Sequence, residues 1–411
     1  MTDLSVKTGV AARLALVGAV ALLFLHLAAV PASCGRPPAG VARLLGGSDS
    51  LLLVGPDGVT MWEHRAGDLR VPASTLKILT ALAALDTLGG GYRFPTDVYT
   101  DGDGGIVVKG HGDPLLVSEA IQGLAGEVAG HLTRCTRIVM DDSAFAPGIV
   151  IPGAGTSLNP YDATVGALVA NFNTVFFSRN KQGRLLSAEE ETPLVPFVRE
   201  IIRRRNLPEG RVVLSRSDRE TTLYPGHLLA HFLAAIDPDL SCREVVVGAV
   251  GPQASPVLRF ESPYTLAEVL EKILEYSNNL MANQVLLAMG ARVYGPPANL
   301  DKGLAVLRKK IDSLGLNSTT VVEGSGISRQ NRMTARDMGR LLRVFEPHAH
   351  LLREHDRLPG VRYKSGHLDG VRTLAGYIPA RNGGRHAFVI FMNTKGASAQ
   401  TVLHRLVAEL P

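Results

Sequence analysis

Ser74-Thr75-Leu76-Lys77 opens a Leu- and Ala-rich run that continues without a helix breaker to Leu88. This composition predicts a buried helix that ends at Gly89-Gly90-Gly91. Ser74 and Lys77 are three residues apart at the start of that helix, so they should share one face. A serine hydroxyl becomes a good nucleophile only when a neighbouring base removes its proton, and a lysine of lowered pKa can be that base. The tetrad therefore suggests a nucleophile and its base.

The same spacing occurs a second time, at Ser178-Arg179-Asn180-Lys181. That copy lies in a polar stretch before Gln182-Gly183 and is typical of a turn. Only the Ser74 copy opens a hydrophobic helix, although a lone Ser-x-x-Lys tetrad is more often structural than catalytic.

Two more short motifs follow in the chain. Ser277-Asn278-Asn279 is a polar break between two apolar helices, the second beginning at Leu280. Taken alone, it is more often a plain helix connection. Lys364-Ser365-Gly366 lies on a predicted strand, where glycine allows a ligand backbone to approach closely and lysine suits a carboxylate. Taken alone, it could be an ordinary strand end.

The order Ser-x-x-Lys, Ser-x-Asn, Lys-Ser-Gly resembles the motif order of the penicillin-recognising serine acyl-transferases. Within that group, the chain from about residue 45 to its end resembles the low-molecular-mass class C penicillin-binding proteins. These are the D-alanyl-D-alanine carboxypeptidase/endopeptidases of peptidase family S13. The further segments that carry the resemblance are Gly110–Leu115, Asp141–Phe145, Tyr161 to Asn173, Gly324–Arg329 and Leu374–Tyr377.

The resemblance implies a serine peptidase that acts on peptidoglycan stem peptides and is covalently inhibited by β-lactams. It implies that Ser74 attacks the carbonyl of the penultimate D-alanine while Lys77 acts as general base. Ser277 would relay a proton to the leaving amine, and Asn279 would orient the reacting groups. Water would then hydrolyse the acyl-enzyme, and neither a cofactor nor a metal is expected.

The resemblance also assigns the residues that bind the substrate. Lys364 and Ser365 would hold its terminal carboxylate, and Gly366 would allow its close approach. The backbone N–H groups of Ser74 and His367 would form the oxyanion hole. Ser365 replaces the usual Thr and His367 the usual Ser, and the insert between Ser74 and Ser277 is shorter than in the best-known members.

Asp141 and Arg329 lie in two of the family-like segments. One hypothesis pairs them beside the active site, where they would grip the charged stem peptide. The alternative is a structural salt bridge between two domains.

The fold class expected is α+β. A penicillin-binding transpeptidase-like (β-lactamase-like) domain, with an antiparallel sheet flanked by helices, should carry an inserted mixed α/β domain. The catalytic domain would comprise residues 41–91 plus 257–411, and the insert residues 92–256. A hairpin near 50–63 and strands near 361–364, 373–378 and 387–392 would form the sheet. Ser262-Pro263 predicts the start of a helix that runs to Tyr276, with Ser262 as its cap.

Residues 1–34 predict export. Lys7 and Arg13 precede an apolar run from Leu14 to Val30, as in a secretory signal. Cleavage after Ala32, lipidation at Cys34 and an uncleaved anchor are all open alternatives. Each would place the rest of the chain in the periplasm or another extracytoplasmic compartment, with possible attachment to the inner membrane.

Composition excludes several other classes of protein. The net charge of +5 is mild for 411 residues, and the basic run Arg203-Arg204-Arg205 fits a solvated helix face better than a nucleic-acid site. His227 and His231 are one helical turn apart, but the glutamate of a zinc-protease helix is missing. Cys135 and Cys242 could pair, although two cysteines in a chain of this length are more often unpaired core residues.

Two rival functions share these features. A β-lactamase has the same three motifs, although the large insert and the Gly-Asp-Pro segment disfavour it. The other rival is a non-catalytic exported protein that binds peptidoglycan or senses β-lactams. The presence of every motif side chain disfavours it.

Overall fold

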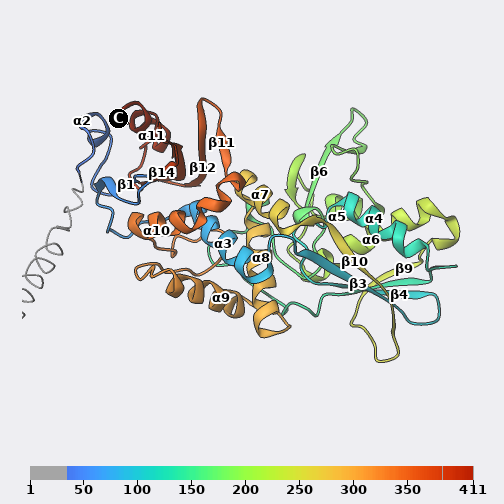
Figure 1. Cartoon of the computed structure of the whole chain (residues 1–411). Coiled ribbons are helices and arrows are strands. Elements are labelled where there is room, and N and C mark those ends of the chain that lie inside the picture. The colour runs from blue at the N-terminus through green and yellow to red at the C-terminus, as the bar shows by residue number, and fades with distance from the viewer. Residues whose placement is uncertain (1–34, 382, 411) are drawn as a thin grey trace, which may run out of the picture.

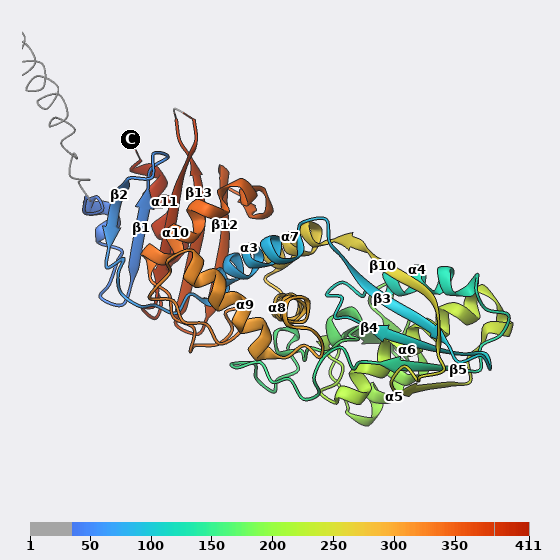
Figure 2. The ribbon, with the colours of Figure 1, turned by 60° about the horizontal axis from the view of Figure 1, so that its bottom comes forward.

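The computed structural model describes residues 35–381 and 383–410. The molecule is elongated, with a six-stranded sheet at one end and a five-stranded sheet at the other (Figures 1 and 2). Helices α3, α7, α8 and α9 lie between the two sheets, with bounds Lys77–Leu88, Leu266–Tyr276, Asn279–Tyr294 and Leu300–Ser313. The predicted N-terminal signal or anchor lies outside the described residues. Within the described residues, no helix is long and apolar enough to cross a membrane.

The six-stranded sheet joins the two ends of the chain. Its order is β11-β12-β13-β14-β1-β2, and every neighbouring pair is antiparallel. The strand bounds are Arg353–His355, Leu358–Leu368, Val371–Pro379, Arg385–Met392, Ser50–Val54 and Thr60–His64. Pairing of β1 with β14 closes the sheet between segments more than 300 residues apart, which confirms the predicted α+β fold with its antiparallel sheet.

Each face of this sheet buries its own apolar core. Leu51, Leu53, Phe388 and Ile390 pack with Leu403 of α11 (Ala399–Ala408) on one face, near the short α2 (Ala39–Ala42). The other face is covered by α10 (Ala335–Phe345) and α3, whose side chains belong to a second core cluster with Leu52, Val389 and Phe391. Strand alternation thus sends neighbouring residues to opposite cores, as the period of two requires.

Helix α3 is buried over its first eight residues, as its Leu- and Ala-rich sequence predicts. It begins as a 3₁₀ turn, η1 (Ala73–Leu76), so that Ser74 lies in η1 and Lys77 is the first α-helical residue. Gly89 has φ +85 and ends the helix at the predicted position.

The helix predicted to start at Ser262-Pro263 begins instead at Leu266, so that prediction is wrong. Ser262 and Pro263 belong to β10 (Ser255–Thr265), which pairs with β3 (Arg93–Thr100). Thr265 is the actual N-cap and forms a reciprocal capping box with Glu268. β10 extends up to this cap because it pairs with β3, a contact that the local sequence does not reveal.

The five-stranded sheet has the order β10-β3-β4-β5-β9 and is mixed, because β5 pairs in parallel with both β4 and β9. A three-stranded sheet β7-β6-β8 lies in the same part of the chain. The bounds of the remaining strands are Gly105–Gly110 (β4), Arg137–Asp141 (β5), Thr174–Arg179 (β6), Leu185–Ser187 (β7), Gly210–Val213 (β8) and Glu244–Val247 (β9). The remaining helices are α4 (Ser118–Ala129), α5 (Pro196–Arg204), α6 (Asp218–Ile236), η2 (Pro160–Asp162), η3 (Asn171–Asn173), η4 (Pro238–Leu240) and η5 (Glu346–Leu351).

Cys135 and Cys242 form a disulfide, so the preference for unpaired cysteines is wrong. Cys135 precedes β5 and Cys242 precedes β9, and these strands are parallel neighbours. The parallel pairing aligns the two strand starts and so brings together cysteines that are 107 residues apart in sequence.

Candidate active site

The three motifs converge on one pocket of about 920 Å³. Ser74 reaches it from η1, Ser277 and Asn279 from the junction of α7 and α8, and Ser365 and His367 from β12. The loop after α9 completes its walls with Ile327, Ser328, Arg329 and Gln330, and the loop before η2 together with η2 itself contributes Gly153, Gly155, Tyr161 and Asp162. Segments separated by up to some 290 residues therefore form one site.

Lys77 lies at the floor of this site and is fully buried. Its Nζ is 3.1 Å from Ser74 Oγ, 2.7 Å from Asn279 Oδ1 and 2.7 Å from the carbonyl oxygen of Ser325. Burial lowers the pKa of Lys77 well below its usual value, and the positive charge of Lys364 lowers it further, while Glu323 opposes both.

The three contacts of Lys77 serve both of its protonation states: an ammonium donates to all three oxygens, and a neutral amine donates to two of them and accepts from the hydroxyl of Ser74. A neutral amine has two N–H donors and one lone pair, whereas an ammonium has three N–H donors and no lone pair. In the neutral form, the carbonyl of Ser325 and the carboxamide oxygen of Asn279 can only accept, so they take the two hydrogens. The lone pair is then left for the hydroxyl of Ser74, which is the arrangement that a general base requires.

Ser277 and Asn279 are placed by the helix junction itself. Ser277 ends α7 in the left-handed conformation, with φ 58, and Asn278 caps α8 by accepting from the N–H of Met281 at 3.0 Å. Asn279 is therefore the first residue of α8, and its carboxamide spans from Lys77 to the carbonyl of Tyr161, 3.2 Å away. The polar break recognised in the sequence is thus a cap that also faces the pocket.

The third motif lies on β12 beside Ser74. Lys364 is 1% exposed and donates to the carbonyl of Ser365 at 2.8 Å. Burial lowers the pKa of Lys364 to about 7. A Cβ added to Gly366 would lie 2.8 Å from Ser74 N and 2.2 Å from Thr373 Oγ1, so only glycine fits between β12 and η1.

His367 follows this glycine and is exposed at the pocket. Partial burial lowers the pKa of the imidazole, and the nearby Arg372 adds to the effect. Thr373, opposite Gly366 on β13, donates to the carbonyl of Pro72 at 2.8 Å and ties the sheet to the start of η1.

The proposed pairing of Asp141 with Arg329 is wrong. Asp141 is buried at the end of β5, where it accepts from the N–H groups of Ser143 and Val250 and lies 3.5 Å from Lys109 Nζ. Arg329 lines the active-site pocket and donates to the carbonyl of Asp369. Membership of two family-like segments did not determine contact, because Asp141 is held at the end of β5 while Arg329 reaches the turn between β12 and β13.

Sequence reasoning missed several pocket residues. Asp162 is buried and holds its own loop by accepting from Gly155 N at 2.7 Å and Ser157 Oγ at 2.6 Å. Tyr161 is 55% exposed at the pocket, and Asp369 lies on the turn between β12 and β13. Tyr161 was noticed only as part of a resembling segment. No local pattern indicated that the loop before η2 would face Ser74.

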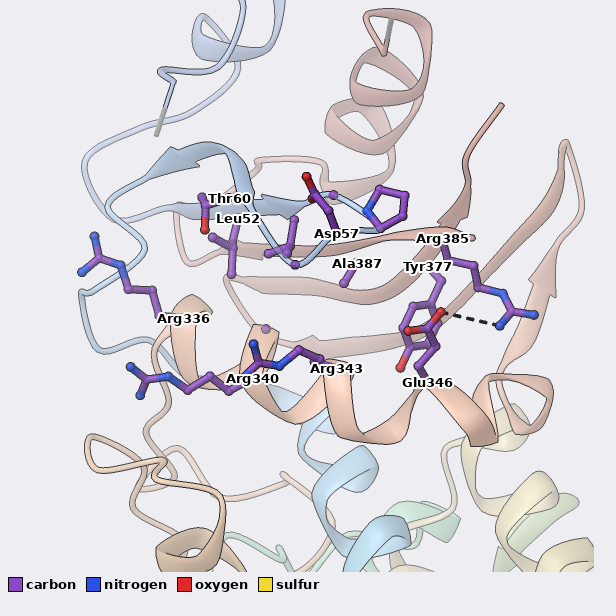
Figure 3. A pocket seen from close by; sticks show the side chains of 15 residues that line it. Leu52, Asp57, Thr60, Arg336, Arg340, Arg343, Glu346, Tyr377, Arg385 and Ala387 are labelled. Atoms are coloured by element: carbon purple, nitrogen blue, oxygen red, sulfur yellow. Dashed lines mark ion pairs between the residues drawn. The ribbon is translucent and has the colours of Figure 1, made fainter. Parts of the chain in front are cut away.

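A second pocket, of about 410 Å³, lies between α10 and the six-stranded sheet, and none of the three motifs lines it (Figure 3). Arg336, Arg340 and Arg343 project from α10 beside it. Acidic groups balance most of this charge: Glu63 pairs with Arg336, Asp337 with Arg340, and Glu346 lies 4.0 Å from Arg385. Among residues 35–381 and 383–410, no group of three or more potential metal ligands is present.

Comparisons with known proteins agree with this geometry. The family model described as "D-Ala-D-Ala carboxypeptidase 3 (S13) family" matches residues 55–196, 209–360 and 353–410. A D-alanyl-D-alanine carboxypeptidase of an Actinomadura species is 24% identical over 85% of this chain and 78% of that protein. Carboxypeptidase DacB of Mycolicibacterium smegmatis is 24% identical over 86% of this chain and 78% of that protein.

Among solved structures, penicillin binding protein 4 (dacB) from Haemophilus influenzae is similar to this chain with a TM-score of 0.70. The two are 17% identical, and the match covers 89% of this chain and 96% of the other. At this level of identity the similarity establishes the fold, which is the penicillin-binding-protein fold predicted from the motifs.

Proposed function

This chain belongs to the D-Ala-D-Ala carboxypeptidase 3 (S13) family, and we propose that its Ser74 forms an acyl-enzyme with peptidoglycan stem peptides. The enzyme is a serine-type D-Ala-D-Ala carboxypeptidase, a hydrolase. The observation that carries the assignment of Ser74 is the contact of its Oγ with Lys77 Nζ, whose other two partners are acceptors.

In the first step, Lys77 removes the hydroxyl proton while Ser74 Oγ bonds to the carbonyl carbon of the penultimate D-alanine. The developing oxyanion would be held by the backbone N–H groups of Ser74 and His367, which the close contact at Gly366 brings together. Removing one such donor from a serine peptidase costs on the order of 10²–10³ in rate. The C–N bond then breaks, and Ser277 passes the proton to the leaving amine.

In the second step, water attacks the acyl-enzyme and restores the Ser74 hydroxyl. Until the terminal D-alanine leaves, Lys364 and Ser365 would bind its carboxylate, because a buried ammonium beside a hydroxyl suits that group. Asn279 would orient both Lys77 and the substrate amide. The reaction as written uses only residues of this chain and water.

The organisation proposed for the chain is a catalytic domain of residues 41–91 plus 257–411 with an insert of residues 92–256. The six-stranded sheet falls wholly within the first set, and this supports the division, whereas β10 of the five-stranded sheet continues past the boundary at residue 257. Residues 1–34 would be a signal peptide or membrane anchor, and the enzyme would work outside the cytoplasm, where peptidoglycan lies.

β-Lactams are the proposed covalent inhibitors, because they present an acylating carbonyl and a carboxylate to the same groups. The penicillin binding protein 4 of Haemophilus influenzae has been solved in complex with a β-lactam and is similar to this chain with a TM-score of 0.64. That complex concerns the relative, so inhibition of this chain needs its own test.

The test is gel labelling of the purified protein with a fluorescent penicillin, beside Ser74→Ala and the matched control Ser178→Ala. Ser178 starts the second Ser-x-x-Lys copy but lies on β6. We expect Ser178→Ala to be labelled like the wild type and Ser74→Ala to be unlabelled. Release of D-alanine from a stem pentapeptide should be lost together with labelling. Labelling that survives in a folded Ser74→Ala variant would contradict the assignment.

A further inference from the structure

Glu323 has a buried carboxylate close to the acceptors of Lys77, and neither the three motifs nor the proposed reaction uses this carboxylate. Its side chain is fully buried in the loop that carries Ser325. Oε2 accepts from Ser325 N and Ser325 Oγ, both at 2.6 Å, and from Asn283 Nδ2 at 3.3 Å. Oε1 accepts from Gly326 N at 2.7 Å, Asn331 Nδ2 at 2.6 Å and Ser328 N at 3.4 Å.

Every partner of Glu323 is a donor, so both of its oxygens act only as acceptors, as those of an ionised carboxylate do. Three of the partners are backbone N–H groups of one loop turn. Hydrogen bonds to a charged acceptor are shorter and stronger than neutral ones. Glu323 therefore fixes the path of the chain from Gly324 to Ser328.

This loop path determines where one acceptor of Lys77 lies. Ser325 is held by Glu323 through its N–H and its hydroxyl, and its carbonyl oxygen accepts from Lys77 Nζ at 2.7 Å. Gly324, the residue before Ser325, is held by two further hydrogen bonds. Its carbonyl accepts from Thr80 Oγ1 of α3, and its N–H donates to Asn283 Oδ1. The carbonyl of Ser325 is consequently one of the most constrained acceptors in the site.

The second acceptor of Lys77 is connected to the same carboxylate. Asn283 lies on α8 one turn after Asn279, and its Nδ2 reaches both the carbonyl of Asn279 and Glu323 Oε2. Both groups that take the hydrogens of the Lys77 amine are therefore linked to Glu323, one directly and one through Asn283.

We propose that Glu323 is the positioning residue of the general base. Its carboxylate holds the Ser325 carbonyl and the start of α8 so that Lys77 presents its lone pair to Ser74 Oγ. The inference rests on the proposed function, because it assumes that Ser74 is acylated with Lys77 as base.

The charges around Lys77 give the proposal a second, electrostatic readout. Lys364 faces Lys77 from β12 and Glu323 faces it from the loop. The other charged or titratable residues that line the same pocket are Arg329, Asp162, His367, Asp369 and Tyr161. Glu323 thus partly compensates the burial of Lys77 and the charge of Lys364, and its removal should make protonation of Lys77 harder.

The experiment compares the wild type with Glu323→Gln and Glu323→Asp, using the rate constant of acylation by a fluorescent penicillin from pH 5 to 9. Glutamine keeps the shape, but its amide nitrogen cannot accept from the donors on its side. We expect Glu323→Gln to acylate on the order of 10²-fold more slowly, as misplacement of a catalytic group does. We also expect the acid limb of its pH profile to move to lower pH, because the amine loses a compensating negative charge.

Glu323→Asp keeps the charge and shortens the side chain by one methylene. It should lose rate while its acid limb remains near that of the wild type. If Glu323→Gln fails to fold, Glu323→Asp still tests the positioning role of Glu323, because an unchanged acylation rate in Glu323→Asp would overturn the proposal.

Asp337→Asn provides the matched control. Asp337 is also buried and also holds a loop, through Ser318 N and Thr319 Oγ1, but it has no contact with the pocket. It should lower the melting temperature without changing the acylation rate or its pH profile.

A purely structural role of Glu323 would give a different pattern. Glu323→Gln would then lose rate equally at every pH, in step with its loss of melting temperature, and this outcome would overturn the proposal. Wild-type rate and profile in Glu323→Gln would overturn it as well. Failure of the wild type itself to be acylated would instead reject the proposed function.

Discussion

Lys77 and Lys364 are both buried at one site, where Lys77 Nζ lies 3.1 Å from Ser74 Oγ and the charge of Lys364 acts on Lys77. The charge of Lys364 and the loss of solvent both lower the pKa of Lys77. One lysine is thereby suited to accept a proton, while the other, with a pKa of about 7, can still bind a carboxylate at neutral pH.

Replacing the base should nearly abolish acylation. Lys77→Met keeps the length of the side chain but removes the amine, and loss of a general base costs about 10²–10⁴ in rate. We expect a fall of that size in the acylation rate constant for a fluorescent penicillin. Circular dichroism should show a folded protein, and a folded Lys77→Met variant with wild-type rate would mean that another group is the base.

The pH profile of kcat/KM should be bell-shaped. Only the neutral form of Lys77 can take the proton, so the rate rises with pH on the acid side. Lys364 loses its charge as pH rises through about 7, so binding of the substrate carboxylate weakens on the alkaline side. Lys364→Arg should move the alkaline limb to higher pH, because a guanidinium stays charged.

Hydrolysis of a stem pentapeptide, followed from pH 5 to 9, gives this profile. The same peptide with an amidated C-terminus is the control substrate, and it should be cleaved poorly at every pH. An alkaline limb that persists unchanged in a folded Lys364→Arg variant would assign that limb to another group.

Gly326→Ala should disrupt the nucleophile without unfolding the protein. Gly326 has φ +83, and an added Cβ would lie 2.0 Å from the carbonyl oxygen of Ala73, next to Ser74. Ser74 must therefore move, and we expect a loss of acylation on the order of 10²-fold.

Gly315→Ala is the control for backbone strain alone. Gly315 has φ +62, but no atom lies within 4 Å of the added Cβ. It should cost about 1–2 kcal/mol of stability and leave acylation intact. Equal rates for the two variants would show that the contact of Gly326 with Ala73 does not position Ser74.

Removal of the disulfide should affect stability more than catalysis. Cys135 and Cys242 close a loop of 107 residues, and loss of such a link typically lowers the free energy of unfolding by about 2–4 kcal/mol. Thermal unfolding of the Cys135→Ser, Cys242→Ser double variant measures this loss. Both cysteines lie at the starts of strands of the five-stranded sheet and neither lines the active-site pocket, so the folded variant should still be acylated. Loss of acylation in the folded double variant would contradict this separation.

Much of the fold could be predicted because its signals are local. The breaker-free run after Ser74 forms a helix that ends at Gly89, as its sequence predicts. The strands near the two chain ends alternate between faces and pair into one sheet. The prediction at Ser262 is wrong because a non-local contact overrides the local signal. Pairing of β10 with β3 extends a strand through residues that locally favour a helix start.

The sequence by itself determined which chemical groups are available and which local elements carry them. Three motifs, each on a helix start, a helix junction or a strand, indicated the serine chemistry, and further segments such as Gly110–Leu115 indicated the family. Tertiary structure alone decided that Lys77 has two acceptors besides Ser74, that Glu323 lies behind it, and that Asp141 and Arg329 do not meet. The reason is physical: a lowered lysine pKa depends on burial and on charges supplied by segments hundreds of residues away, and neither can be read from neighbours in the chain.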